Sequence, residues 1–149
     1  MTKLFCFLAL MCCTIGCSKK HSDKEIGAQQ IYQVTIYYIE WSVETFRSLS
    51  CEDLQRNGDS IIVREIKLIE NLTRAMEVAT LTPLPEHDDI DARVCCIFRD
   101  SSENVLHSLS FSPPPVMKLD GKVFERDRRL FEVVLSLLPS DYLKGWSID

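Results

Sequence analysis

The chain has 149 residues, of which 17 are basic (Lys and Arg) and 22 are acidic (Asp and Glu), and its formal net charge is −5. Nucleic acid binding requires a basic surface, so this balance excludes a nucleic acid partner from our expectations. The length suffices for one compact domain with a single core.

The first 20 residues have the layout of a secretory signal. Lys3 precedes a stretch of apolar and small residues from Leu4 to Gly16, and two lysines follow soon after. A helix that spans a bilayer needs about 20 apolar residues, and this stretch is shorter. We therefore predict that residues 1–16 are a cleaved signal peptide rather than a retained membrane span.

The end of this stretch, Thr14, Ile15, Gly16 and Cys17, resembles the lipobox of bacterial lipoproteins. In that motif a small residue precedes a cysteine that receives lipid and becomes the first residue of the mature chain. Gly16 and Cys17 fit the motif, whereas Thr14 stands where a leucine is usual. The resemblance implies lipid attachment at Cys17 and a place in the bacterial cell envelope. Ser18 resembles the residue type that sends lipoproteins onward to the outer membrane.

Cleavage leaves 16 basic and 22 acidic residues, a formal net charge of −6. Each lipid methylene buried in the bilayer contributes about 0.8 kcal/mol, so several acyl chains would hold the chain at a membrane. Residues 18–30 are polar and lack periodicity, which predicts a flexible tether between the lipidated Cys17 and the domain. We expect residues 31–149 to form that domain.

The domain is predicted to begin with a strand at 31–41, where β-branched and aromatic residues occupy both faces. Apolar character on both faces indicates a central strand, and the alternative is an exposed aromatic recognition surface. Ser50 is a predicted helix cap, and this helix stops at Asn57 and Gly58. For 61–65 we favour a separate strand over the start of the next helix.

That next helix is predicted to continue to Pro83 and Pro85. Its apolar stripe comprises Ile66, Ile69, Leu72, Ala75, Met76 and Ala79.

From Ile90 onward the apolar pattern has a period of two, and a further strand is predicted at 105–111. Pairing the two strands across a loop at 100–103 places apolar residues opposite one another. The predicted pairs are Phe98 with Val105, Cys96 with His107, and Val94 with Leu109.

Three prolines at 113–115 end the second of these strands. Asp120 and Gly121 lie between two short apolar runs, which predicts a tight hairpin. A last helix is expected at about 127–138, with Asp127 as its cap. Its core-facing residues are predicted to be Leu130, Val133, Val134, Leu137 and Leu138. The sum is a single small α+β domain, a mostly antiparallel sheet with two or three helices packed against it.

The predicted register brings Cys96 beside His107, so that a thiol nucleophile and a base could lie together. Both residues fall on the apolar face, and no third group can be named to orient the histidine. We favour burial of Cys96, because cysteine is among the most buried residue types.

Two other groups of residues could carry chemistry. Glu86, His87, Asp88, Asp89 and Asp91 offer oxygen and imidazole ligands. They lack the spacing and the glycine of an EF-hand, so we favour a solvated acidic turn and expect no metal.

Cys51, Cys95 and Cys96 are the cysteines that remain in the domain. An oxidising envelope favours one disulfide, for example between Cys51 and Cys95, although the adjacent Cys96 is an alternative partner. Because one disulfide uses two of the three cysteines, one thiol would stay free.

The sequence has no glycine-rich phosphate loop, no serine in a nucleophile elbow and no HExxH motif, so we expect no cofactor. Our first hypothesis is a non-enzymatic protein-binding module at the envelope, either an immunity protein or inhibitor or an accessory subunit. Its partners would be the membrane, through the lipid, and a protein of unknown identity. The alternative is a small envelope thiol enzyme that uses Cys96 and His107.

Overall fold

The computed structural model describes residues 31–41, 43–86, 89–113 and 115–145. The predicted signal peptide (1–16), Cys17 and the tether (18–30) lie outside the described residues. Among the residues that are described, no helix is both long enough and apolar enough to cross a membrane.

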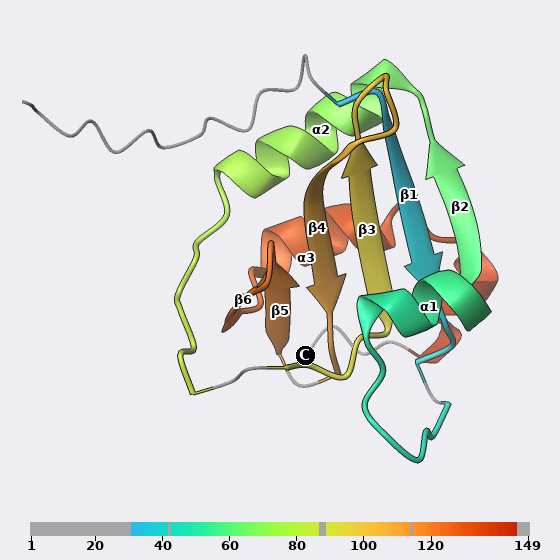
Figure 1. The fold of residues 1–149 in the computed structure, drawn as a ribbon, viewed down its shortest axis with the longest axis vertical. Helices are drawn as coiled ribbons and strands as arrows, with labels where there is room; N and C mark the ends of the chain where they lie inside the picture. Colours follow the sequence, from blue (N-terminus) through green and yellow to red (C-terminus); the bar gives the residue numbers. More distant parts are fainter. Residues whose placement is uncertain (1–30, 42, 87–88, 114, 146–149) are drawn as a thin grey trace, which may run out of the picture.

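The described residues form a six-stranded sheet, with each neighbouring pair of strands antiparallel (Figure 1). The order across the sheet is β2-β1-β3-β4-β5-β6. The strands are β1 (Gln33–Tyr38), β2 (Asp59–Val63), β3 (Val94–Arg99), β4 (Val105–Phe111), β5 (Val116–Leu119) and β6 (Lys122–Glu125). The helices are α1 (Cys51–Asn57), α2 (Ile66–Glu77) and α3 (Arg128–Leu135), followed by a 3₁₀ helix, η2 (Ser140–Gly145).

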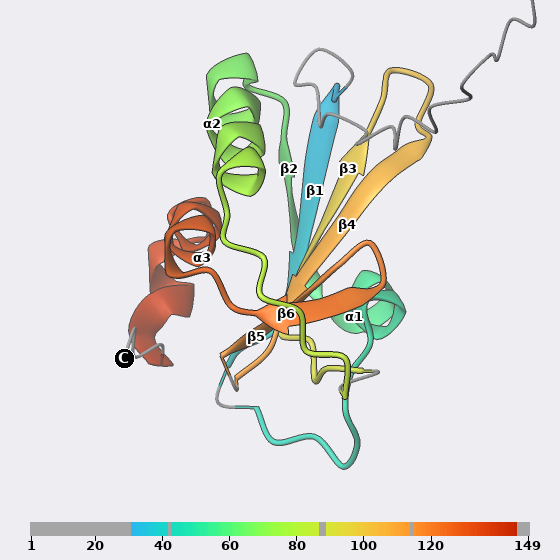
Figure 2. The ribbon, with the colours of Figure 1, turned by 90° about the vertical axis from the view of Figure 1, so that its left-hand side faces the viewer.

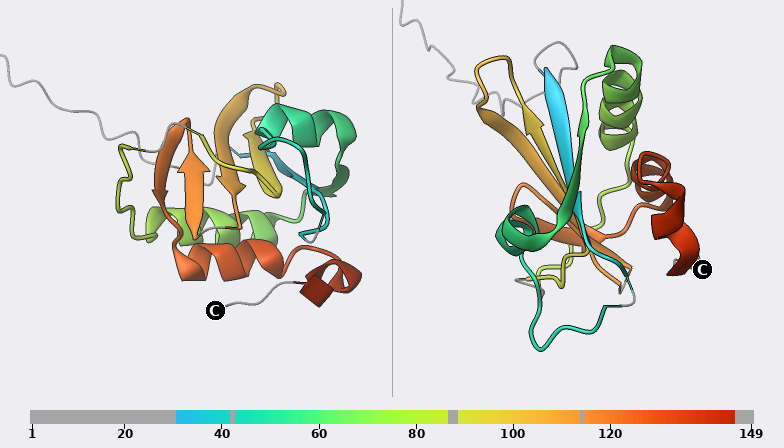
Figure 3. Two further views of the ribbon diagram at one scale, coloured as in Figure 1. Left: turned by 90° about the horizontal axis from the view of Figure 1, so that it is seen from below. Right: turned by 90° about the vertical axis from the view of Figure 1, so that its right-hand side faces the viewer.

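These elements confirm the predicted α+β fold, and the helices divide between the two faces of the sheet. Figures 2 and 3 show α2 and α3 on one face and α1 on the other. The main core lies between the sheet and the α2/α3 pair, where Ile36, Phe98, Phe111 and Phe131 are fully buried. A smaller cluster beneath α1 contains Leu54, Ala92, Cys95 and Ile97.

The central strand at β1 is confirmed, since β1 pairs with β2 on one side and β3 on the other. Val34 and Ile36 point into the main core, whereas Tyr37 packs against the cluster beneath α1. The separate strand predicted near Ile61 is also present, as β2. Ile62 pairs with Thr35 on the face away from the main core and is 56% exposed, whereas Val63 on the same edge strand faces the main core and is 8% exposed.

The predicted end of the long helix is wrong, because α2 stops at Glu77 rather than at Pro83. The chain beyond it is extended and lies along β6: Pro83 forms a bridge with Phe124, and the Leu84 amide donates to the Val123 carbonyl at 3.0 Å. Pro83 therefore belongs to this extended segment rather than to the helix end, and Pro85 lies in the turn that follows it. The prediction that Ile66 belongs to the buried apolar stripe is also wrong, because Ile66, in the first turn of α2, is 72% exposed.

Both of the predicted turn and cap signals near the C-terminus are confirmed. Asp120 and Gly121 join β5 to β6 with φ values of 47° and 82°, the left-handed conformation that such a turn requires. Asp127 caps α3 by accepting a hydrogen bond from the Leu130 amide at 2.8 Å. The buried face of α3 differs from the prediction, because Phe131 and Leu135 are buried along with Leu130 and Val134.

Candidate functional site

A loop between β1 and α1 extends beyond the sheet on the side where α1 begins (Figure 1). Its described parts are 39–41 and 43–50, and the phenyl side chain of Phe46 is fully exposed. Val43 is also exposed, at 43%. Of the large apolar side chains described, Phe46 is the most exposed, so this loop is the candidate site.

Arg93, immediately before β3, holds the first half of the loop. Its guanidinium is buried and donates to the Val43 carbonyl at 2.6 Å and to the Thr45 hydroxyl at 3.4 Å. The same group forms an ion pair with Asp91 at 2.6 Å. A buried charge without partners is costly, so the loop and Arg93 stabilise each other. The backbone at 43–45 is therefore tied to the sheet.

Asp91 and Ala92 hold the second half of the loop. The second carboxylate oxygen of Asp91 accepts the Leu49 amide at 2.9 Å, and the Ala92 amide donates to the Leu49 carbonyl at 2.8 Å. Both backbone groups of Leu49 are thus paired with the segment that leads into β3. Phe46 lies between two anchored stretches of backbone.

Helix α1 begins directly after the loop, with Ser50 as its cap. The Ser50 hydroxyl accepts the Asp53 amide at 3.2 Å, and the Asp53 carboxylate accepts the Ser50 amide at 3.0 Å. Arg47 donates to both oxygens of Asp53, at 2.9 and 2.7 Å. These bonds, above all those from Arg47, hold the pKa of Asp53 well below its usual range.

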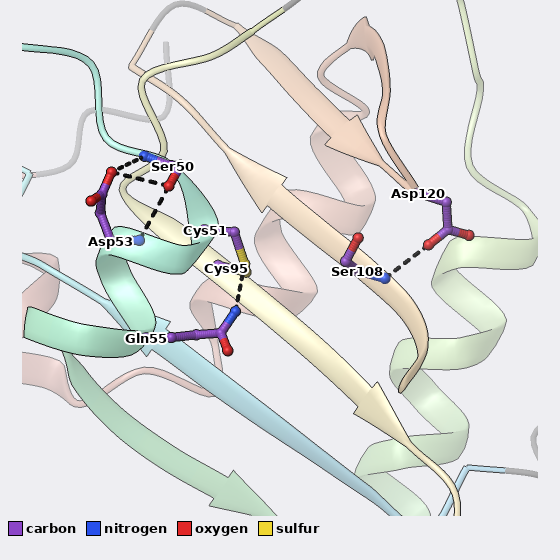
Figure 4. The surroundings of a disulfide bond; sticks show 7 residues. All are labelled: Ser50, Cys51, Asp53, Gln55, Cys95, Ser108 and Asp120. Carbon is purple, nitrogen blue, oxygen red and sulfur yellow. Dashed lines mark hydrogen bonds between the residues drawn. A yellow bond between two sulfur atoms is a disulfide. The ribbon is translucent and has the colours of Figure 1, made fainter. Parts of the chain in front are cut away.

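A disulfide between Cys51 and Cys95 joins the first turn of α1 to β3 (Figure 4). The two Cα atoms are 5.6 Å apart, within the range that a disulfide spans. Cys51 and Cys95 are the pair that we gave as an example of a disulfide from the sequence. Leu54 and Ile97 pack beside it, so the bond lies over the smaller apolar cluster. The end of the loop is thereby fixed covalently one residue after Ser50.

The predicted register of β3 and β4 is wrong. His107 pairs with Phe98, and Cys96 pairs with Leu109, so the strands are shifted by two residues from the prediction. The cause is the connecting loop, in which the Asp100 carboxylate accepts the amides of Ser102 and Asn104. A bulge between Phe98 and Arg99, at the end of β3, precedes this loop.

The shift separates the predicted nucleophile and base. Cys96 is a free thiol, fully buried in the main core, and burial raises its pKa well above the usual range. His107 instead contacts Asp120, with its Nδ1 atom 2.8 Å from a carboxylate oxygen. Thus no observation favours a thiolate at Cys96 activated by His107.

The acidic stretch at 86–91 is divided between different partners. Asp91 pairs with Arg93, and Asp89 lies 3.3 Å from the Lys118 ammonium. His87 and Asp88 lie outside the described residues. Within the described ranges, no three or more His, Cys, Asp or Glu residues are grouped so that they could hold a metal ion.

Neither the exposed Phe46 nor the hydrogen bonds of Arg93 to the loop were predicted from the sequence. A signal was present, because Arg93 lies two positions after Asp91 at the start of an apolar strand, and charged residues in such a place are buried only when they are paired. The loop that Arg93 contacts could not be inferred from the spacing of residues in the sequence.

No family of known proteins, no curated protein and no solved structure matches this chain.

Proposed function

We propose that the chain is a lipoprotein of the bacterial cell envelope, anchored through Cys17, whose domain binds a protein partner without catalysing a reaction. It would act as an immunity protein or inhibitor, or as an accessory subunit. The single observation that carries this proposal is the fully exposed Phe46 on a loop whose backbone is held on both sides.

An exposed apolar side chain by itself says little, because most protein surfaces have some. The supporting feature here is the amount of structure that holds the loop. A buried guanidinium, a carboxylate and a disulfide all act on or next to 43–51. Holding a loop in its bound conformation reduces the entropy lost on association, so such a loop suits a binding surface.

The disulfide also supports the proposed location. Structural disulfides persist in oxidising compartments such as the bacterial envelope and are rare in the cytosol. Cys51 and Cys95 would form such a bond after export, and Cys17 would be free to take lipid. The predicted signal peptide and the resemblance to a lipobox support the same compartment, independently of the domain.

Lipid labelling tests the anchor. Replacing Cys17 by serine removes the only sulfur at the motif, so Cys17→Ser is expected to abolish incorporation of labelled fatty acid. It should leave a precursor or a non-lipidated envelope protein. Cys13→Ser, which changes a cysteine inside the predicted signal peptide, is the matched control and should keep the label. Unchanged labelling of Cys17→Ser would contradict the anchor.

Affinity capture tests the binding function. The full lipidated chain in detergent, immobilised and exposed to envelope extract, should retain a protein in a saturable manner. Excess soluble bait should compete for the same protein. If no protein is retained saturably, the proposed function is wrong. A toxin gene adjacent to this one would favour immunity, whereas a transport or polysaccharide locus would favour an accessory role.

A further inference from the structure

We propose that Phe46 is the anchor of the partner interface and enters a recessed apolar pocket on a partner protein, with lysine or arginine side chains around the rim of that pocket. This inference rests on the proposed function. It adds the surface that is used and the chemistry of the partner.

The backbone around Phe46 is prepared for such an insertion. The neighbouring Thr45 accepts from Arg93 and donates its hydroxyl hydrogen to the Arg47 carbonyl at 2.8 Å. Arg47 in turn reaches Asp53 on α1. Phe46 thus has an anchored residue on each side while its own ring remains in water. Large aromatic side chains presented in this way are typical of the few residues that dominate an interface.

Charge around the loop points to a basic partner surface. Segment 39–53 contains four acidic residues and one basic residue, Arg47. Arg47 and Asp53 form an ion pair, so these two charges cancel and neither contributes to the attraction of a partner. The carboxylates of Glu44 and Glu52 are exposed. A basic rim around the pocket would complement these carboxylates and accelerate encounter.

The same charges argue against two other occupants of this surface. Anionic lipid headgroups would repel the acidic loop, and one aromatic ring gives little apolar area for membrane insertion. A second copy docking loop to loop would place like charges together. A different protein, with an apolar pocket surrounded by basic residues, fits both the ring of Phe46 and the carboxylates of Glu44 and Glu52.

Site-specific photocrosslinking identifies what contacts the ring. A photoreactive phenylalanine analogue at position 46 of the full lipidated chain, irradiated in envelope membranes, should crosslink to one protein. The same analogue in place of Tyr32, an exposed aromatic on a different part of the surface, is the control and should not give that product. Crosslinking of position 46 only to lipid or to a second copy would overturn the inference, as would equal products at both positions.

Affinity measurements with the captured protein test the anchor. Phe46→Ala should weaken binding by about 30-fold or more, as loss of a central aromatic anchor does. Tyr32→Ala should leave the affinity within about twofold, as truncation of an aromatic outside the interface does. Phe46 is fully exposed, so its truncation should not change the thermal unfolding midpoint, which separates lost contact from lost fold.

Charge reversal tests the basic rim. Glu44→Lys should slow association by about tenfold at low salt, and the difference should shrink as salt is added. Glu70→Lys makes the same charge change at an exposed position on α2 and should have a much smaller effect. Equal effects of the two reversals would exclude a basic rim facing Glu44.

The outcomes distinguish this inference from the proposed function. Saturable binding that Phe46→Ala leaves unchanged would overturn the inference while the binding function stands. The absence of any saturable partner would overturn the proposed function itself, and the inference with it.

Discussion

Asp53 combines three roles at one carboxylate. It caps the backbone at Ser50, accepts the Ser50 hydroxyl and receives both donors of Arg47. The pKa of Asp53 in the folded chain is therefore well below its usual value, chiefly because of Arg47. As the pH falls, the unfolded chain takes up a proton at this residue before the folded chain does. The stability that Asp53 contributes is complete above about pH 5 and is lost progressively as the pH falls below that value.

The lowered pKa of Asp53 leads to a prediction for the Asp53→Asn variant. The unfolding midpoint in urea should fall less between about pH 5 and about pH 3 in this variant than in the parent chain, because a titrating group is gone. Glu52→Gln removes an exposed carboxylate at the preceding position and serves as the control, which should keep the parental dependence. An identical pH profile for Asp53→Asn and the parent would contradict the role assigned to Asp53.

The turn between β5 and β6 offers a test of backbone conformation without packing effects. Gly121 has φ of +82°, and a Cβ added there would have no atom within 4 Å. Gly121→Ala should therefore lower the free energy of unfolding by about 1 kcal/mol through backbone strain alone. Lys122→Ala, the next residue and exposed, is the control and should change little. Equal stability of the two variants in urea denaturation would show that this turn does not impose its conformation.

The two hairpins show what can be predicted from sequence at the scale of an element. The β5/β6 turn was predicted correctly because Asp120 and Gly121 are residue types that tolerate left-handed backbone. The β3/β4 register was not, because apolar residues on both strands permit several alignments. The choice between them depends on hydrogen bonds of Asp100 and on a bulge, neither of which follows from periodicity.

Across the whole molecule, the candidate site was less predictable than the fold. The alternation of apolar residues indicates strands, and capping residues indicate where helices begin. On that basis β1, β2 and the caps Ser50 and Asp127 were predicted correctly. The backbone beside Phe46 is held by Arg93, which lies 47 positions later in the chain. A phenylalanine in a sequence has no local mark that distinguishes an exposed anchor from a core residue.

The disulfide is expected to carry much of the stability on the α1 face, because the apolar cluster there is small. Cys51 and Cys95 are 44 positions apart, and closing a loop of this size in the unfolded chain is worth about 3–4 kcal/mol. Reduction should therefore lower the free energy of unfolding by about that amount, measured by urea denaturation with and without reductant. The double variant Cys51→Ala/Cys95→Ala should match the reduced chain and be insensitive to reductant. If reductant leaves the parent chain unchanged, the bond does not stabilise the fold, and the apolar cluster around Leu54 must hold α1 on the sheet.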